Sequence, residues 1–150
     1  MRFWAVNTSV QRNGDLERLG EHAKFLAKRG VNMVRHHGHL APGRGSKLSD
    51  VNEAEIERVW KLVAAMKAEG IYTTFSPYWG SHTKVEASWG LADAENDNLT
   101  GLLFYDEKLQ AAYKGWLRAL LEPVNPHTGV ALAKDPALAI FQIQNEDSHP

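Results

Sequence analysis

The sequence contains no cysteine, which excludes disulfide bonds and thiolate chemistry. It has no apolar run close to the ~20 residues that a membrane helix needs, and the opening stretch MRFWAVNTSV lacks the apolar core of a signal peptide. It also lacks a dense group of lysine and arginine residues, and its formal net charge is −1. We therefore expect binding neither to nucleic acid nor to a membrane. With no repeat and no low-complexity tract, residues 1–150 are predicted to form one soluble domain that buries its own core.

What is present is an alternation of segments typical of strands with amphipathic segments typical of helices. Strands are predicted at 2–7, 31–36, 71–76 and 138–144, and helices at 15–29, at 53–69 and from about Asp106 to just before Pro123. The order βαβαβαβ predicts an α/β fold with a parallel sheet and crossover helices. The connection at about 77–105 is unusually long. Long connections at the carboxyl ends of parallel strands are where such folds build active sites.

Residues that cap and end helices stand where the pattern needs them. Asn13 or Asp15 is the predicted cap of the first helix, whose apolar stripe begins at Leu16. Asn52 is the predicted cap of the second helix. A glycine follows each of these two helices, which indicates where each helix ends.

The end of the fourth strand, IFQIQNED at 140–147, is the first candidate site. Asn145 and Glu146 are predicted just past the strand, and Gln142 and Gln144 point polar groups to one face of it. Partial burial there would suit Glu146 to act as a general acid. A surface glutamate at a strand end is the other interpretation, and spacing alone favours it.

The second strand and its exit, VNMVRHHGH at 31–39, form the second candidate. Arg35 is predicted at the end of this strand, where it would orient a carboxylate or bind a hydroxyl group. His36, His37 and His39, with His82, are candidate zinc ligands. No HExxH or comparable spacing supports a metal, so we favour hydrogen-bonding loop histidines and predict neither a metal nor another cofactor.

Aromatic residues gather in the long third connection. Tyr78, Trp79 and Trp89 lie there, and Trp4 is in the first strand. Such rings stack on the apolar faces of sugars, but a long loop also needs an apolar plug. For any single one of these residues, sugar stacking and core packing are equally compatible with the sequence.

Three stretches together resemble the first half of the clan A glycoside hydrolases, the cellulase-like enzymes of the family 5 type. They are RFWAVN at 2–7, GVNMVRHH at 30–37 and NPHTGVALAKDPALAIFQIQNEDS at 125–148. The resemblance implies half of a (β/α)₈ TIM barrel, with strands one to four and three crossover helices. It also implies a role in carbohydrate metabolism, with a carbohydrate as substrate.

The resemblance implies roles for particular residues. Glu146 corresponds to the acid/base of a retaining glycosidase, Asn145 to the residue that contacts the sugar, and Arg35 to the active-site arginine. His37 and Trp79 are our further candidates for substrate binding. The family's nucleophile lies on strand seven, which these 150 residues do not contain, and retention needs two carboxyl groups ~5–5.5 Å apart. We therefore expect little or no activity from this chain alone. The third strand, IYTTFSPYWG, also departs from the histidine-bearing strand ends of the clan.

A half-barrel would leave strands one and four as open edges and one face of the sheet uncovered. We therefore predict a homodimer or larger assembly, unless the chain is part of a longer protein. The competing hypothesis is a non-catalytic, self-associating half-barrel that at most binds carbohydrate. A metal-dependent hydrolase that uses the histidines is a weaker third.

Overall fold

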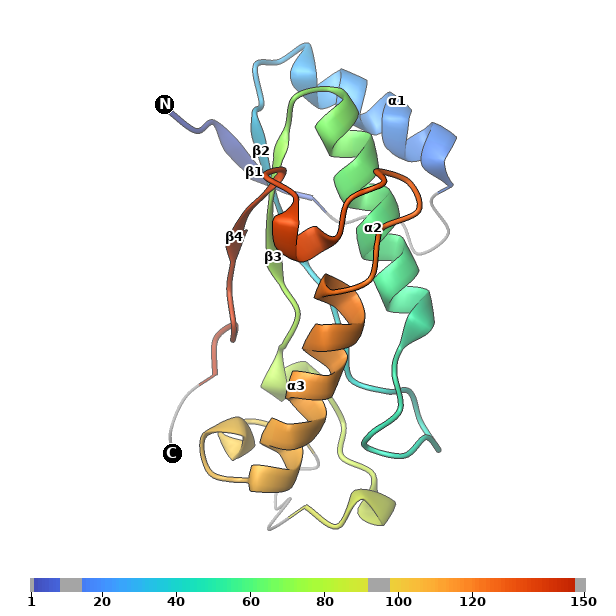
Figure 1. The fold of residues 1–150 in the computed structure, drawn as a ribbon. Helices are drawn as coiled ribbons and strands as arrows, with labels where there is room; N and C mark the ends of the chain where they lie inside the picture. The colour runs from blue at the N-terminus through green and yellow to red at the C-terminus, as the bar shows by residue number, and fades with distance from the viewer. Residues whose placement is uncertain (1, 9–14, 92–97, 148–150) are drawn as a thin grey trace.

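The structure is a computed structural model that describes residues 2–8, 15–91 and 98–147. Its centre is a parallel sheet of four strands in the order β1-β2-β3-β4. The strands are β1 (Ala5–Asn7), β2 (Met33–His37), β3 (Tyr72–Ser76) and β4 (Leu138–Phe141), and the helices between them are α1 (Leu16–Ala27), α2 (Glu53–Ala68) and α3 (Glu107–Leu121). All three helices lie on one side of the sheet (Figure 1). The predicted α/β class with three crossover helices is confirmed.

The helices begin and end at the residues that local chemistry favours. Asp15 caps α1, since its side chain accepts a hydrogen bond from the backbone N–H of Arg18; the alternative cap, Asn13, lies outside the described residues. Asn52 caps α2 in the same way. Gly30 and Gly70, which follow α1 and α2, have φ of 77° and 71°, and glycine adopts this left-handed conformation without steric cost.

The side chains of the sheet alternate between a face that packs on the helices and an open face. Val34 of β2 packs with residues of α1 and α2, while Phe75 of β3 packs with α2 and α3. Arg35 and Thr74 are register partners on the opposite face. One expected core position is wrong, because Leu16 is 39% exposed at the first residue of α1.

Strand β4 is shorter than predicted and pairs less regularly. It ends at Phe141 rather than at residue 144, and its register with β3 shifts between Thr73 and Thr74. No helix follows β4 among the described residues, yet Phe141 packs on the core, so the helix-facing side of β4 is partly covered. Beyond the strand, the Tyr113 hydroxyl of α3 donates a 2.6 Å hydrogen bond to the carbonyl of Ile143. Helix α3 thereby holds the segment that follows β4.

The described parts of the long connection after β3, residues 77–91 and 98–106, contain short 3₁₀ turns at Gly80–His82, Ala87–Trp89 and Leu102–Phe104. Tyr78 and Trp89 are buried in the core beneath it. The Tyr78 hydroxyl donates to the carbonyl of Leu99 at 3.0 Å, and the Trp89 indole donates to that of Ser46 at 2.8 Å. For these two aromatic residues the core interpretation is therefore the right one.

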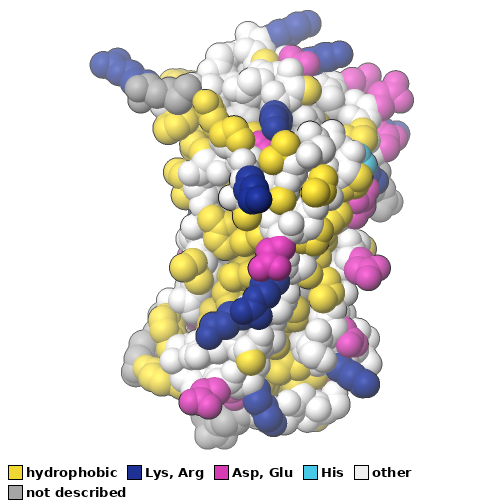
Figure 2. Space-filling view, in the orientation of Figure 1, with side chains coloured by type: hydrophobic (Ala, Val, Ile, Leu, Met, Phe, Trp, Pro, Cys, Tyr) yellow, Lys and Arg dark blue, Asp and Glu magenta, His cyan; other side chains and the backbone are white. Residues whose placement is uncertain are grey.

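Exposed apolar side chains lie on and beside the two edge strands. Ile140, the register partner of Thr74 on the open face, is 49% exposed, while Trp4 before β1 and Ile143 after β4 are 67% and 61% exposed. In the view of Figure 2, hydrophobic side chains run along the side of the molecule where β4 lies. Within the described part of the chain, no helix combines the length and the apolar character needed to cross a membrane.

Candidate functional site at the carboxyl ends of the strands

The side chain of Arg35 joins β2 to the segment that follows β4. Arg35 is the third residue of β2, which continues to His37, so it does not end the strand as predicted. Its Nη2 donates to Oε1 of Gln142 at 2.7 Å and to Oδ1 of Asn145 at 2.9 Å. These residues are more than 100 positions apart in the sequence, and β3 lies between their strands. The parallel register brings all of them to one edge of the sheet, as predicted from the ends of the strands.

Asn145 is held on two sides and is only 2% exposed. Its side-chain oxygen accepts from Arg35, while its backbone N–H donates to the carbonyl of Tyr78 at 3.1 Å. The preceding Gln142 continues the pairing with β3, since its backbone N–H donates to the carbonyl of Phe75 at 2.9 Å. The segment after β4 is therefore fixed to the sheet as far as Asn145.

Glu146 projects from this fixed segment in an uncommon backbone conformation. Its φ of 47° makes it the one non-glycine residue with positive φ in the described part of the chain. Such a conformation costs an L-residue about 1–2 kcal/mol and persists where neighbouring contacts hold it. Glu146 is exposed, so the partial burial that we expected is not found.

Asp147 anchors the other side of Glu146. Its Oδ1 accepts from the backbone N–H of Gly101 at 2.7 Å, and its Oδ2 accepts from Nε2 of Gln144 at 3.2 Å. Both carboxylate oxygens of Asp147 are thus used within the fold. This geometry makes Asp147 a positioning group and not a second free carboxylate.

His37 lies close enough to Glu146 to be influenced by its charge. Burial and then the charge of Arg35 lower the pKa of His37 below 6.5, with smaller contributions from His36 and His39, while Glu146 opposes the shift. The lowered pKa favours the neutral ring at pH 7. A neutral imidazole both donates and accepts hydrogen bonds.

Trp79 stands between histidine rings and is not an open platform. The centroid of its ring is 5.4 Å from that of His37, 6.2 Å from that of His39 and 3.7 Å from that of His82. The indole Nε1 of Trp79 and the Nδ1 of His37 are buried and form no hydrogen bond within the described chain. Trp79 and His37 therefore lie side by side at the carboxyl edge of the sheet. We call the part of this edge that carries Arg35, His37, Trp79, Asn145 and Glu146 the mouth.

The histidines are not gathered around a common point. His36 turns to the helix side, where its ring stacks on Phe75 at 5.8 Å and its Nε2 is 3.8 Å from Oε1 of Glu55. Within residues 2–8, 15–91 and 98–147, no three His, Asp or Glu side chains are placed to share a metal ion. The weaker hypothesis of a metal-dependent hydrolase gains no support from this arrangement.

Sequence reasoning missed part of this site. It placed Gln142 on the polar face of β4 but gave it no role, although Gln142 accepts the shortest hydrogen bond of Arg35. It also missed a cavity beside the mouth, which His39, Arg44 and Glu55 help to line. Charged residues in loops carry no local signal that they will face a common space.

No family model and no curated protein sequence matches the chain. Several solved structures superpose on it. An endo-β-1,4-mannanase from Thermotoga petrophila superposes with a TM-score of 0.71 over 97% of this chain at 17% identity. An endo-1,4-β-mannanase from Rhizomucor miehei superposes with a TM-score of 0.73 over 96% of the chain at 14% identity. A GH5_18 protein from Bifidobacterium longum, solved in complex with Manb1-4GlcNAc, gives a TM-score of 0.63 at 18% identity.

The matched region is a fraction of each of these proteins. The chain spans 35% of the Thermotoga chain, 43% of the Rhizomucor chain and 29% of the Bifidobacterium chain. The fold of the described residues is therefore a partial barrel of the kind found in family 5 glycoside hydrolases. The resemblance drawn from the three sequence stretches is confirmed at the level of the fold.

Proposed function

We propose that this chain is the acid/base-bearing part of a retaining β-glycosidase. One observation carries the proposal: Arg35 of β2 holds Asn145 after β4, directly beside the exposed Glu146. This constellation lies at the carboxyl edge of a parallel sheet, where barrel enzymes of this architecture carry their catalytic groups. The family resemblance assigns the same three positions.

In the proposed reaction Glu146 acts twice. As the acid it donates its proton to the glycosidic oxygen while the bond from that oxygen to the anomeric carbon breaks. A second carboxylate forms the covalent glycosyl intermediate. Glu146, now a carboxylate, then takes a proton from the water that attacks the anomeric carbon, while the bond from that carbon to the second carboxylate breaks. The family resemblance places the second carboxylate on strand seven, outside these 150 residues. Within the chain, Asp147 is adjacent to Glu146, but each of its oxygens already accepts a hydrogen bond inside the fold.

A β-1,4-linked mannoside is the substrate class that we infer. Two of the structures with the same fold are named as β-1,4-mannanases. Trp79 and His37 would provide an apolar edge and a neutral hydrogen-bonding ring beside the sugar.

Binding and turnover test the proposal separately. In a nuclear magnetic resonance titration with β-1,4-mannotriose, we expect the Arg35 guanidinium and Trp79 indole signals to shift, and Asn145→Ala to weaken the shifts. Shifts confined to residues far from the mouth would contradict it. With aryl β-mannosides we expect very weak turnover or none, because one member of the carboxyl pair is missing.

Any turnover should disappear in Glu146→Gln and remain in the control Glu122→Gln, which changes an exposed carboxylate after α3. Robust turnover that depends on Glu146 would mean that a second carboxylate is recruited, either Asp147 or one from a partner chain. Turnover that is indifferent to Glu146→Gln would place the chemistry at another site.

A second candidate function is a non-catalytic half-barrel that associates with itself and binds carbohydrate. The observation in its favour is the exposed apolar surface of Ile140 and Trp4 beside the edge strands. In a two-fold dimer that closes the sheet, the two Glu146 side chains would stand on opposite sides of one mouth, too far apart for retention. Carbohydrate binding that is lost when the dimer dissociates, and that is unchanged in Asn145→Ala and Glu146→Gln, would favour this function.

A further inference from the structure

A cavity of about 750 Å³ lies beside the mouth, between the connection that follows β2 and the connection that follows β3. Its size is within the range of about 300–1,000 Å³ that is typical of small-molecule sites. Arg35, Asn145 and Glu146 do not line it. It is therefore a second concave site, separate from the groups of the proposed reaction.

The acidic floor of the cavity is already compensated. Glu55 of α2 is buried, and its Oε2 is 2.8 Å from Nη2 of Arg58. Its Oε1 accepts from the backbone N–H of His39 at 3.4 Å. A Cβ on Gly38 would stand 2.7 Å from this same oxygen, so the approach of the two segments requires glycine. Glu55 thus belongs to the framework of the cavity and leaves little negative charge for a ligand.

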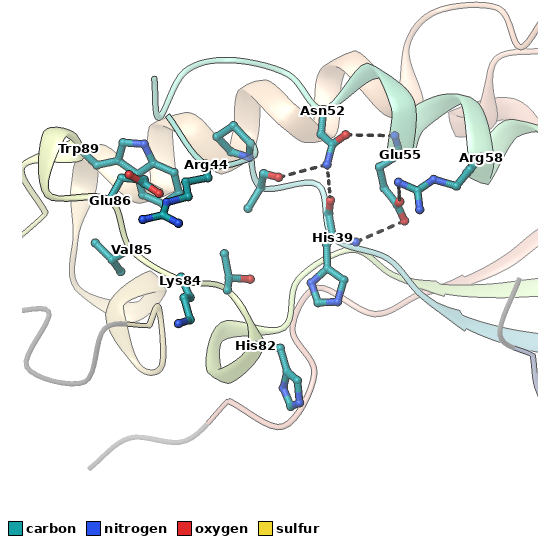
Figure 3. A pocket seen from close by; sticks show the side chains of 13 residues that line it. His39, Arg44, Asn52, Glu55, Arg58, His82, Lys84, Val85, Glu86 and Trp89 are labelled. Carbon is teal, nitrogen blue, oxygen red and sulfur yellow. Dashed lines mark hydrogen bonds and ion pairs between the residues drawn. The ribbon is translucent and has the colours of Figure 1, made fainter. Parts of the chain in front are cut away.

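The opposite wall carries cations without such compensation. Arg44 and Lys84 line the cavity, and neither takes part in an ion pair among the described residues. In Figure 3 no dashed line joins either of them to a neighbour. Glu86 on the same wall is the one remaining acidic group of the lining. Two uncompensated cations and one uncompensated carboxylate favour an anionic ligand.

Trp79 connects this cavity to the mouth. His39 and His82 line the cavity, and their rings contact that of Trp79. His37 contacts the same indole from the mouth. A chain of sugar units that passes Trp79 would therefore lead from Glu146 towards Arg44 and Lys84.

We propose that the cavity binds the carboxylate of a uronic acid unit in a saccharide, with Arg44 and Lys84 as its cationic contacts. A guanidinium holds a carboxylate through two parallel N–H···O bonds, and an ammonium adds a compact charge. The choice of a saccharide rests on the proposed function, whereas the binding of an anion rests on the cavity alone.

Three probes distinguish the binding of an anion from the binding of a saccharide: a β-1,4-linked mannuronate trisaccharide, neutral β-1,4-mannotriose, and inorganic sulfate. The two trisaccharides differ only in the group at C6. By titration calorimetry on the 150-residue chain, we expect mannuronate to bind about tenfold more tightly than mannotriose at low salt, with the difference shrinking at about 0.5 M sodium chloride.

Substitutions locate the binding. Arg44→Gln and Lys84→Gln should each weaken the binding of mannuronate roughly fivefold or more. Arg118→Gln and Lys114→Gln are the matched controls, since both change exposed cations on α3 away from the cavity, and they should leave the affinity unchanged. Glu86→Gln removes the one opposing charge and should strengthen binding. A disturbed fold would not raise the affinity for mannuronate in Glu86→Gln while lowering it in Arg44→Gln.

Equal binding of the two trisaccharides, or unchanged affinity in both cavity variants, would overturn the proposal. If sulfate occupies the cavity as tightly as mannuronate does, the cavity is a site for inorganic anions and the proposal of a saccharide ligand is wrong. None of these measurements needs turnover. A chain that binds mannuronate through Arg44, but whose Arg35 and Trp79 signals do not shift with β-1,4-mannotriose, would refute the proposed function and keep the anion site.

Discussion

Arg35 supplies the link between β2 and the segment that carries Asn145 and Glu146. In Arg35→Met the buried Asn145 would lose the charged donor to its side-chain oxygen. Hydrogen bonds to charged groups contribute about 1.5–3 kcal/mol, so we expect the free energy of unfolding to fall by about 1–3 kcal/mol.

Urea denaturation of Arg35→Met and of the control Arg118→Met measures this difference. Arg118 is exposed on α3 and has no ion pair among the described residues, so its substitution should stay within about 0.5 kcal/mol of the parent. Equal stability of the two variants would mean that the two hydrogen bonds of Arg35 contribute nothing net.

The charge of Glu146 should be detectable at His37. Glu146 raises the pKa of His37 against burial and against the charge of Arg35, which lower it. In Glu146→Gln the opposing charge is gone, so the pKa of His37 should fall further below 6.5. Titration of the ring signals by nuclear magnetic resonance checks this. An unchanged His37 pKa would show that Glu146 does not stand beside this ring in solution.

At the scale of elements, the first turn of α2 is attached to the exit of β2 through Glu55. Burial disfavours the charged form of Glu55, but contact with His36, the charges of Arg58 and His36 and the His39 N–H outweigh it, so the pKa of Glu55 lies below 4.5. A carboxyl group whose pKa is lowered on folding stabilises the fold above its unfolded pKa. That stabilisation is lost as the pH falls below about 4.5 and through the folded-state pKa.

The predicted result is a steeper loss of stability in acid for the parent than for Glu55→Gln. Urea denaturation at two pH values, one near neutrality and one well below the pKa of Glu55, gives the comparison. Glu55→Gln should be the less stable of the two near neutrality, because Arg58 loses its partner, and the gap should narrow in acid. Parallel pH profiles would mean that Glu55 has the same pKa in the folded and unfolded chain.

At the scale of the whole molecule, the three helices cover one face of the sheet and leave the other open (Figure 1). Fully burying one large apolar side chain contributes about 1.5–3 kcal/mol, so covering several such side chains is comparable with the stability of a domain. Among the described residues, β1 and β4 are the edge strands of the sheet, and no further strand pairs with their outer edges. We therefore expect the 150-residue chain to self-associate, with β4 of one copy beside β1 of another.

Sedimentation equilibrium at micromolar concentration should give a mass of at least twice 16.8 kDa. Ile140→Glu places a charge on the open face and should shift the equilibrium towards the monomer. Val124→Glu, an exposed site after α3, should not. A stable monomer of 16.8 kDa would show that the open face needs no partner.

The elements could be predicted from the sequence because their signals are local. The spacing of apolar residues, the caps Asp15 and Asn52, and the glycines that end α1 and α2 each act within a few residues of the chain. Two strands are predicted too long: β1 begins at Ala5 rather than at residue 2, and β4 ends at Phe141 although Gln142 and Ile143 continue the alternation. The alternation of apolar and polar residues predicts an extended backbone, but it does not predict whether a neighbouring strand pairs with it.

The sequence by itself determined the order of strands and helices, the parallel sheet and the edge at which a site would form. Only the tertiary structure decided that Arg35 holds Asn145, that Tyr78 and Trp89 are core, and that Glu146 is exposed in a left-handed conformation. It also decided that Arg44 and Lys84 face one cavity. The physical reason is distance along the chain: helix and strand signals repeat within a few residues, whereas these contacts join residues tens to more than a hundred positions apart, which meet only after the sheet has formed.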